Sequence, residues 1–301
     1  MENREYDYST LMKRLNGLVG DYGHLKLSYI GTSLMSRPIP AVTIGDGEAK
    51  KGVLYVATHH ASENICTSFI VDFIEEYARL ITLGRYICGV NTRVLFRMRS
   101  ITVVPMLNPD GVEYRLHGVS EDNPLYERVM KYNCGDDFTH WNANARGVDL
   151  NHNYNAYFDE YKSVEADSGI TPGKSRYSGE APESEPETAA LTNYIRYNIG
   201  KISGILTFHS QGEEIFYRSQ GLEAPRSEFI AKRISRMTGY ALSEADGMAS
   251  YGGLTDWFIK EFNKPSFTIE CGRGENPLPM SQKSGIYTRL RETLYTFPIL
   301  L

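Results

Sequence analysis

The sequence of 301 residues predicts a single α/β domain, with a mixed, mostly parallel central sheet and helices on both of its faces. Short apolar runs such as 53–58 and 202–208 have the length and composition of strands that are buried on both faces. Segments with apolar residues at helical spacing alternate with these runs, which is typical of a parallel sheet covered by helices. No internal repeat or low-complexity linker divides the chain, so we expect one domain over residues 1–301.

The first third of the chain begins with apolar positions at helical spacing over 7–22, which predict an amphipathic helix. Two alternating runs, 25–30 and 39–44, then predict a hairpin, and we expect residues 1–50 to be part of the same domain. The strand 53–58 precedes a helix whose apolar stripe includes Phe69, Phe73 and Tyr77. Apolar runs at 94–98 and 101–107 lead into Asn108-Pro-Asp-Gly111, a strong turn signal.

Residues 112–183 are rich in Gly, Asn, Asp and Pro, which favours functional loops in so compact a chain. A helix is predicted over 184–197, with Ser184 as its N-cap and Glu187 completing a capping box. The remaining elements are strands at 202–208 and 266–269 and helices at 226–238, 254–262 and 284–296.

Composition excludes several classes of partner. The net charge is −5 and no basic stripe is present, so nucleic acid is not expected as a partner. No window approaches the roughly 18–20 apolar residues of a membrane span, and the first residues contain no apolar signal core. The four cysteines are far apart, so we expect reduced thiols in a cytoplasmic protein. The oligomeric state is not indicated.

Histidine and glutamate side chains, which can bind metal ions, follow three of the predicted strands. His60 and Glu63 follow strand 53–58, His209 follows 202–208, and Glu270 follows 266–269. The carboxyl ends of parallel strands meet at one edge of a sheet. Two imidazoles and a carboxylate there predict one catalytic Zn²⁺ per chain, with a coordination position left for water.

Glu270 is then the expected general base, taking the proton of that water. By alternation, His59 should point away from the metal. Each residue also has an ordinary interpretation. A histidine at a strand end often makes only a hydrogen bond, Glu63 could be an acid that the helix dipole favours, and Glu270 could be a buried salt-bridge partner. It is the agreement of three strand ends that favours zinc.

These residues resemble the zinc carboxypeptidases of the carboxypeptidase A type, over nearly the whole chain. The matching motifs are His60-x-x-Glu63, Asn108-Pro-Asp-Gly111, Gly147-Val-Asp-Leu-Asn-His-Asn153, His209, Gly252-Gly253 with Asp256-Trp257, and Glu270. The resemblance implies that His60, Glu63 and His209 bind zinc and that Glu270 is catalytic. It also implies that Asn151 and its neighbour bind a substrate carboxylate.

Two departures concern the substrate. His152 stands where the family has an arginine, and a guanidinium and an imidazole are not equivalent ligands for a carboxylate. The family's mobile tyrosine has no clear match: Met248 is near its place, and Tyr251, three residues on, is a candidate substrate-binding hydrogen-bond donor or else a packing residue. Arg146 is the nearest cation to the expected clamp and is a candidate substrate or oxyanion ligand. Glu213 and Glu214 follow His209 and are candidates to orient it.

With the segment 141–153, these departures resemble the bacterial γ-D-glutamyl–diamino acid peptidase branch of the family. That resemblance implies hydrolysis of the amide between γ-D-glutamate and meso-diaminopimelate or lysine in cell-wall peptides, and so a recycling role. An ordinary metallocarboxypeptidase acting on L-peptides is the first alternative, and an amidohydrolase acting on acylated amino acids is another. The alternative of a different class is a non-catalytic peptide-binding protein on the same fold.

Overall fold

The computed structural model describes residues 5–245 and 251–301 and confirms the α/β class. Its main sheet has eight strands in the order β1-β2-β6-β3-β7-β10-β8-β9. These strands are β1 (Leu25–Thr32), β2 (Pro38–Ile44), β3 (Lys51–Ala57), β6 (Arg99–Val104), β7 (Ile202–His209), β8 (Glu214–Phe216), β9 (Ala241–Leu242) and β10 (Ser266–Glu270). The strands β4 (Tyr86–Ile87) and β5 (Val90–Asn91) form a separate small ribbon.

The centre of the sheet is parallel. The strands β6, β3, β7 and β10 pair in parallel, so their carboxyl ends lie along one edge. The strands β1 and β2 form the expected antiparallel hairpin, and β2 pairs antiparallel with β6. On the other side, β8 pairs antiparallel with β10. The prediction of a mixed, mostly parallel sheet is therefore confirmed at its centre, with antiparallel pairs on both flanks.

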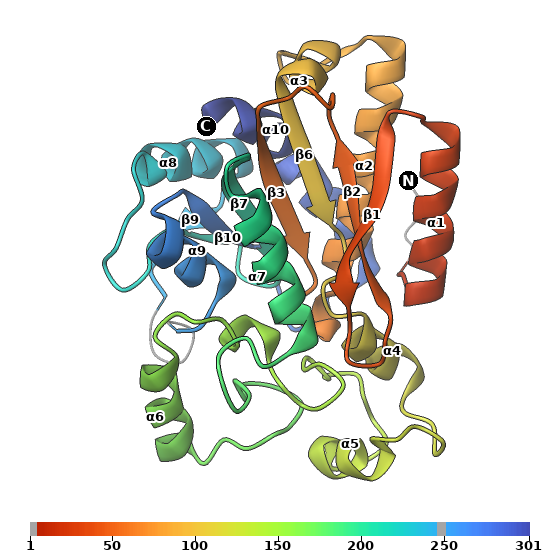
Figure 1. Cartoon of the computed structure of the whole chain (residues 1–301), viewed down its shortest axis with the longest axis vertical. Coiled ribbons are helices and arrows are strands. Elements are labelled where there is room, and N and C mark those ends of the chain that lie inside the picture. Colours follow the sequence, from red (N-terminus) through yellow and green to blue (C-terminus); the bar gives the residue numbers. More distant parts are fainter. Residues whose placement is uncertain (1–4, 246–250) are drawn as a thin grey trace.

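Helices cover both faces of the sheet (Figure 1). One side carries α1 (Tyr8–Asp21), α2 (Ile65–Leu83), α8 (Ser227–Thr238) and α10 (Lys283–Leu300), whose apolar residues join one core cluster. The other side carries α7 (Pro186–Asn198) and α9 (Leu254–Phe262), which belong to a second cluster. No helix among the described residues has the length and apolar character that crossing a bilayer requires.

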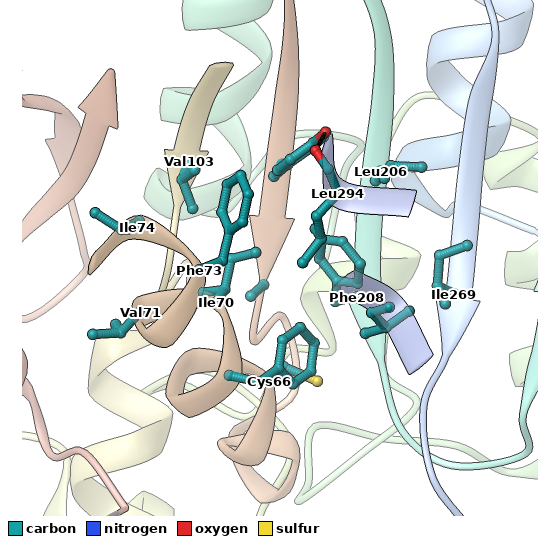
Figure 2. Close-up of a cluster of buried hydrophobic side chains, with 14 of the residues drawn as sticks. Cys66, Ile70, Val71, Phe73, Ile74, Val103, Leu206, Phe208, Ile269 and Leu294 are labelled. Carbon is teal, nitrogen blue, oxygen red and sulfur yellow. Dashed lines mark hydrogen bonds between the residues drawn. The ribbon is translucent and has the colours of Figure 1, made fainter. Parts of the chain in front are cut away.

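The strand β3 shows why the sheet is buried on both faces. Val53 and Tyr55 point into the first core cluster, while Leu54 and Val56 point into the second. Figure 2 shows the first cluster, to which the helix α2 contributes Phe73 and the strand β7 contributes Phe208. The continuous apolar run that predicted this strand is thus the direct result of two buried faces.

The apolar run 94–98, for which no element was predicted, lies in the helix α3 (Thr92–Met98), where the Asn91 side chain caps the backbone N–H groups of Arg93 and Val94. One predicted local feature differs from the structure. The capping box at α7 is absent. Glu185 is the N-cap residue, without a side-chain cap, and Glu187 is drawn away to accept a hydrogen bond from the backbone N–H of Leu34.

The segment predicted as functional loops lies below the carboxyl ends of the strands (Figure 1). It contains three short helices, α4 (Pro109–His117), α5 (Tyr126–Asn133) and α6 (Phe158–Ser168), and otherwise turns and loops. Its position at that edge means that the long irregular region covers the end of the sheet where the polar side chains emerge.

Candidate active site

The backbone after β3 is shaped to present two side chains to the same point. A short 3-10 turn, η1 (Ala61–Glu63), follows His60, and the N–H of Glu63 bonds to the carbonyl of His60. The amide of Asn108 donates to the carbonyl of His59, 2.9 Å away, while its Oδ1 caps α4 at Gly111. The Asn-Pro-Asp-Gly motif therefore fixes the turn that carries His60 and Glu63.

The third side chain arrives from the neighbouring strand, where His209 is the last residue of β7. Its Nδ1 lies 3.0 Å from Oε2 of Glu63 and 3.3 Å from Nδ1 of His60. The Nδ1 of His60 is in turn 3.0 Å from Oε1 of Glu63. Among the described residues, these three form the single His/Cys/Asp/Glu group whose ligand atoms all lie within 4.8 Å of one another.

The geometry of the three side chains fits zinc. Two nitrogen ligands at a usual Zn–N distance of about 2.05 Å and a tetrahedral angle lie about 3.3 Å apart. The observed separation of the two Nδ1 atoms is 3.3 Å. Two facing imidazole nitrogens and a buried carboxylate thus surround one point, which suits a cation. His60, Glu63 and His209 would therefore hold the ion.

The electrostatics of the site also favour a cation. Burial opposes the charged form of His60, but the carboxylates of Asp149 and Glu63 outweigh burial and raise its pKa well above the ordinary value. Burial alone would raise the pKa of Glu63, yet His60 and His209 lower it to about 2. The structure thus stabilises positive charge at this point, which is what a metal site requires.

Asp149 is a site residue that the sequence analysis did not single out. Its Oδ1 lies 2.9 Å from Nε2 of His60, and its Oδ2 accepts the backbone N–H of Arg176. A metal-binding histidine commonly donates its second ring N–H to a carboxylate, which fixes the ring and its tautomer. The available signal was its place in the Gly147–Asn153 motif, two residues before Asn151.

A cleft of about 270 Å³ opens at this group, lined in part by His60, Asn151, His152 and Glu270. Glu270 is the last residue of β10 and pairs with His209 in the parallel ladder, so the two side chains leave the sheet at the same edge. Burial, followed by the charge of Glu63, raises the pKa of Glu270 well above its ordinary value. A proton-accepting carboxylate is therefore placed in the cleft that the metal ligands border.

His152 is fixed in one orientation. Its Nδ1 lies 2.7 Å from the carbonyl oxygen of Tyr251, so this nitrogen carries the hydrogen and donates it. Its ring stacks on Tyr161 with centroids 4.1 Å apart. Burial lowers the pKa of His152, against the opposing charge of Asp149. The neutral ring then has an acceptor at Nε2, and an acceptor does not bind a carboxylate.

Other predicted residues are placed differently. Arg146 does not line the cleft: its Nε lies 2.7 Å from the buried carboxylate of Glu185, which takes up its charge. The ring of Tyr251 packs against Tyr157, and Tyr251 is not among the described residues of the cleft wall. Met248 lies outside the described residues.

Three further side chains complete the comparison with prediction. Glu213 pairs with Arg273, and Glu214 accepts the hydroxyl of Ser243, so neither orients His209. His59 is buried, with Nε2 2.9 Å from the hydroxyl of Tyr154, and does not join the ligand group, as its alternation with His60 predicts.

An α/β sheet that presents two histidines and a glutamate at its carboxyl edge, with a further carboxylate in the cleft, defines a metallohydrolase. The model of one family, zinc carboxypeptidase, matches residues 11–295. The chain therefore belongs to the zinc carboxypeptidase family of metallopeptidases, whose cofactor is one zinc ion.

Known proteins agree with this assignment. The chain is 35% identical to γ-D-glutamyl-L-diamino acid endopeptidase 1 of Lysinibacillus sphaericus, over 94% of this chain and 70% of that protein. Its fold is similar to that of bovine thrombin-activatable fibrinolysis inhibitor, with a TM-score of 0.75, 18% identity and coverage of 99% and 97%. It is also similar to that of murein-tripeptide amidase MpaA from Escherichia coli O157, with a TM-score of 0.55, 20% identity and coverage of 89% and 91%.

Proposed function

We propose that this protein hydrolyses the amide bond between γ-D-glutamate and a diamino acid, meso-diaminopimelate or lysine, in cell-wall peptides. The observation that carries the proposal is His152. An acceptor nitrogen replaces the expected guanidinium, so the site lacks the ordinary grip on a C-terminal carboxylate. The 35% identity to a γ-D-glutamyl-L-diamino acid endopeptidase supports the same substrate class.

In this proposal each side chain has a defined role. His60, Glu63 and His209 hold the zinc, which when bound polarises the substrate carbonyl and acidifies a water molecule. Glu270 accepts the proton of that water and delivers it to the leaving amine. Asp149 holds the N–H of His60 at Nε2, so that Nδ1 presents its lone pair to the metal site.

The substrate is positioned by residues of the cleft wall. Asn151 accepts the backbone N–H of Leu254 through Oδ1, 3.3 Å away, which orients its amide group in the cleft for donation to a substrate oxygen. His152 offers an acceptor to an N–H of the substrate. Tyr251 contributes through its carbonyl, which orients His152. Arg146 is not assigned a contact with the substrate, because its guanidinium holds Glu185.

Mass spectrometry of the products tests the proposal. The zinc-loaded protein is incubated with L-Ala-γ-D-Glu-meso-diaminopimelate, with its lysine counterpart, and with a standard L-peptide of the same length. We expect L-Ala-D-Glu and the free diamino acid from at least one of the first two, and slow or no release from the L-peptide. Faster release of the C-terminal residue from the L-peptide would establish the ordinary carboxypeptidase instead. Absence of bound zinc and of all hydrolysis would leave the non-catalytic binding protein. A cytoplasmic location stays a prediction.

A further inference from the structure

The cleft has an outer end that the proposed hydrolysis does not use. Its wall includes Arg218 and Asp256, as well as His60, Glu270 and Glu214 at the metal side, where Glu214 pairs with Glu270 in the β8–β10 ladder. Arg218 and Asp256 also line a smaller pocket that adjoins it. Among the described residues of the cleft wall, Arg218 is the single lysine or arginine. The outer end therefore brings the guanidinium of Arg218 and the carboxyl group of Asp256 to the same space.

Arg218 is held in a position suited to a carboxylate ligand. Its guanidinium lies over the ring of Tyr217, 4.9 Å from the centroid, and its Nε is 3.0 Å from Glu223. The Nη1 atom pairs with Glu244, whose side chain is 73% exposed. An ion pair this exposed is weak, so a substrate carboxylate can replace Glu244 at little cost. The planar fork of arginine then allows two parallel hydrogen bonds.

One acidic group at this end complements the arginine. Asp256 lies in the first turn of α9, where its Oδ2 accepts the backbone N–H of Gly253 at 3.3 Å. Burial raises its pKa to about 7, and a nearby ammonium would return it to the charged form. This end of the cleft thus suits a group that carries both an ammonium and a carboxylate.

We propose that the outer cleft binds the far end of the diamino acid side chain, with Arg218 on its carboxylate and Asp256 on its ammonium. A side chain that ends in both groups belongs to a diamino dicarboxylic acid such as diaminopimelate. Lysine carries the ammonium alone and leaves Arg218 without a ligand. Arg218 is therefore the residue that makes the enzyme prefer diaminopimelate over lysine. This inference rests on the proposed function.

Two substrates that differ only in that carboxylate test it. We measure kcat/KM for L-Ala-γ-D-Glu-meso-diaminopimelate and L-Ala-γ-D-Glu-L-Lys with the wild type, Arg218→Met and the control Arg226→Met. Arg226 is exposed and, like Arg218, lies over an aromatic ring, here that of Phe229, but it is not part of the cleft wall. We expect the wild type to favour diaminopimelate at least 10-fold. Arg218→Met should reduce that ratio by roughly 10- to 100-fold, as expected for losing a charge-assisted pair, and the control should keep it.

A wild type that cleaves lysine peptides equally well, or an Arg218→Met variant with an unchanged ratio, would overturn the inference while leaving the proposed function intact. Wild-type protein that cleaves neither substrate overturns both. Arg218→Lys, which keeps the charge and loses the fork, should give an intermediate ratio even if the methionine variant does not fold. Asp256→Asn tests the ammonium: it should reduce the preference for a lysine peptide over the norleucine analogue, and an unchanged preference would contradict that contact.

Discussion

At the scale of single residues, the position of His60 between two carboxylates governs the site. Its Nδ1 and Nε2 lie 3.0 Å and 2.9 Å from Glu63 and Asp149. Two buried anions on either side of one imidazole require positive charge, which a proton or a metal ion can supply. A zinc ion, unlike a proton on His60, would also bind the ring nitrogen of His209. Glu270 pairs with His209 in the parallel ladder and lines the cleft, but it is not a member of the ligand group.

Glu270→Gln tests whether that carboxylate is the base. The amide keeps the size of the side chain but cannot accept a proton at the pH of the reaction. We expect kcat to fall by about 10²- to 10⁴-fold, while zinc content, measured by elemental analysis, stays at one per chain. The exposed Glu180→Gln is the matched control and should retain wild-type kcat. Turnover that survives in Glu270→Gln would mean that another group accepts the proton.

The residue scale also shows what a sequence can and cannot predict about the site. His60, Glu63, His209 and Glu270 were predictable because each follows an apolar run that can only be a buried strand, and parallel strands end together. The partner of Arg146 was not predictable. The buried carboxylate of Glu185, 39 positions away in the sequence, binds its guanidinium. Only the fold of the irregular region brings the two side chains together.

At the scale of elements, the start of α7 shows how tertiary contacts replace local capping. Glu187 has the spacing of a capping-box residue, but its Oε1 bonds to Leu34 and its Oε2 lies 3.3 Å from the Asn144 amide. The carboxylate thus connects α7 with the β1–β2 turn and with the loop before Asp149. Sequence spacing indicates only the local capping contact and not the distant backbone N–H that competes for the same carboxylate. The predicted capping box was therefore wrong, although the helix itself was confirmed.

The cost of this connection is a pH-dependent stability. Burial, with a contribution from Asp110, raises the pKa of Glu187 to about 7 from 4.5. Because the raised pKa belongs to the folded state, stability is fully present below about pH 4.5 and is lost as the pH rises towards 7. The loss is about 3 kcal/mol at most.

Glu187→Gln should remove this dependence, since the amide stays neutral and still accepts from Leu34. We expect the melting temperature of the variant, relative to wild type, to rise by several degrees between pH 5 and pH 8 in calorimetry. The exposed Glu180→Gln again serves as the control and should show no such change. An equal loss of stability at both pH values would mean that the hydrogen bonds of Glu187, and not its charge, matter.

At the scale of the whole molecule, two core clusters of different composition pack on opposite faces of one sheet. The three metal ligands lie at the carboxyl ends of the central strands, beyond both clusters. The apolar clusters on the two faces hold β3 and β7 side by side. The ligands extend from these strands beyond the ladder, into a region built mostly of turns and short helices. The sheet therefore fixes the direction of each ligand. A zinc ion held by them would connect the two strand ends, and Asp149 already connects His60 to the irregular segment.

Removal of zinc should consequently lower the stability of the folded chain, not only its activity. A ligand that binds the folded state alone stabilises it by about 2.7 kcal/mol at 100 times its dissociation constant. We expect the melting temperature to fall after treatment with a chelator and to recover in proportion to the logarithm of free zinc. The effect should weaken as the pH falls, because the raised pKa of His60 makes protons compete with the metal. His209→Gln removes one of the three ligands and is the matched variant, with a smaller response to zinc. Identical melting curves with and without chelator, for a wild type shown to contain one zinc, would mean that the sheet holds the three ligands in place without the ion.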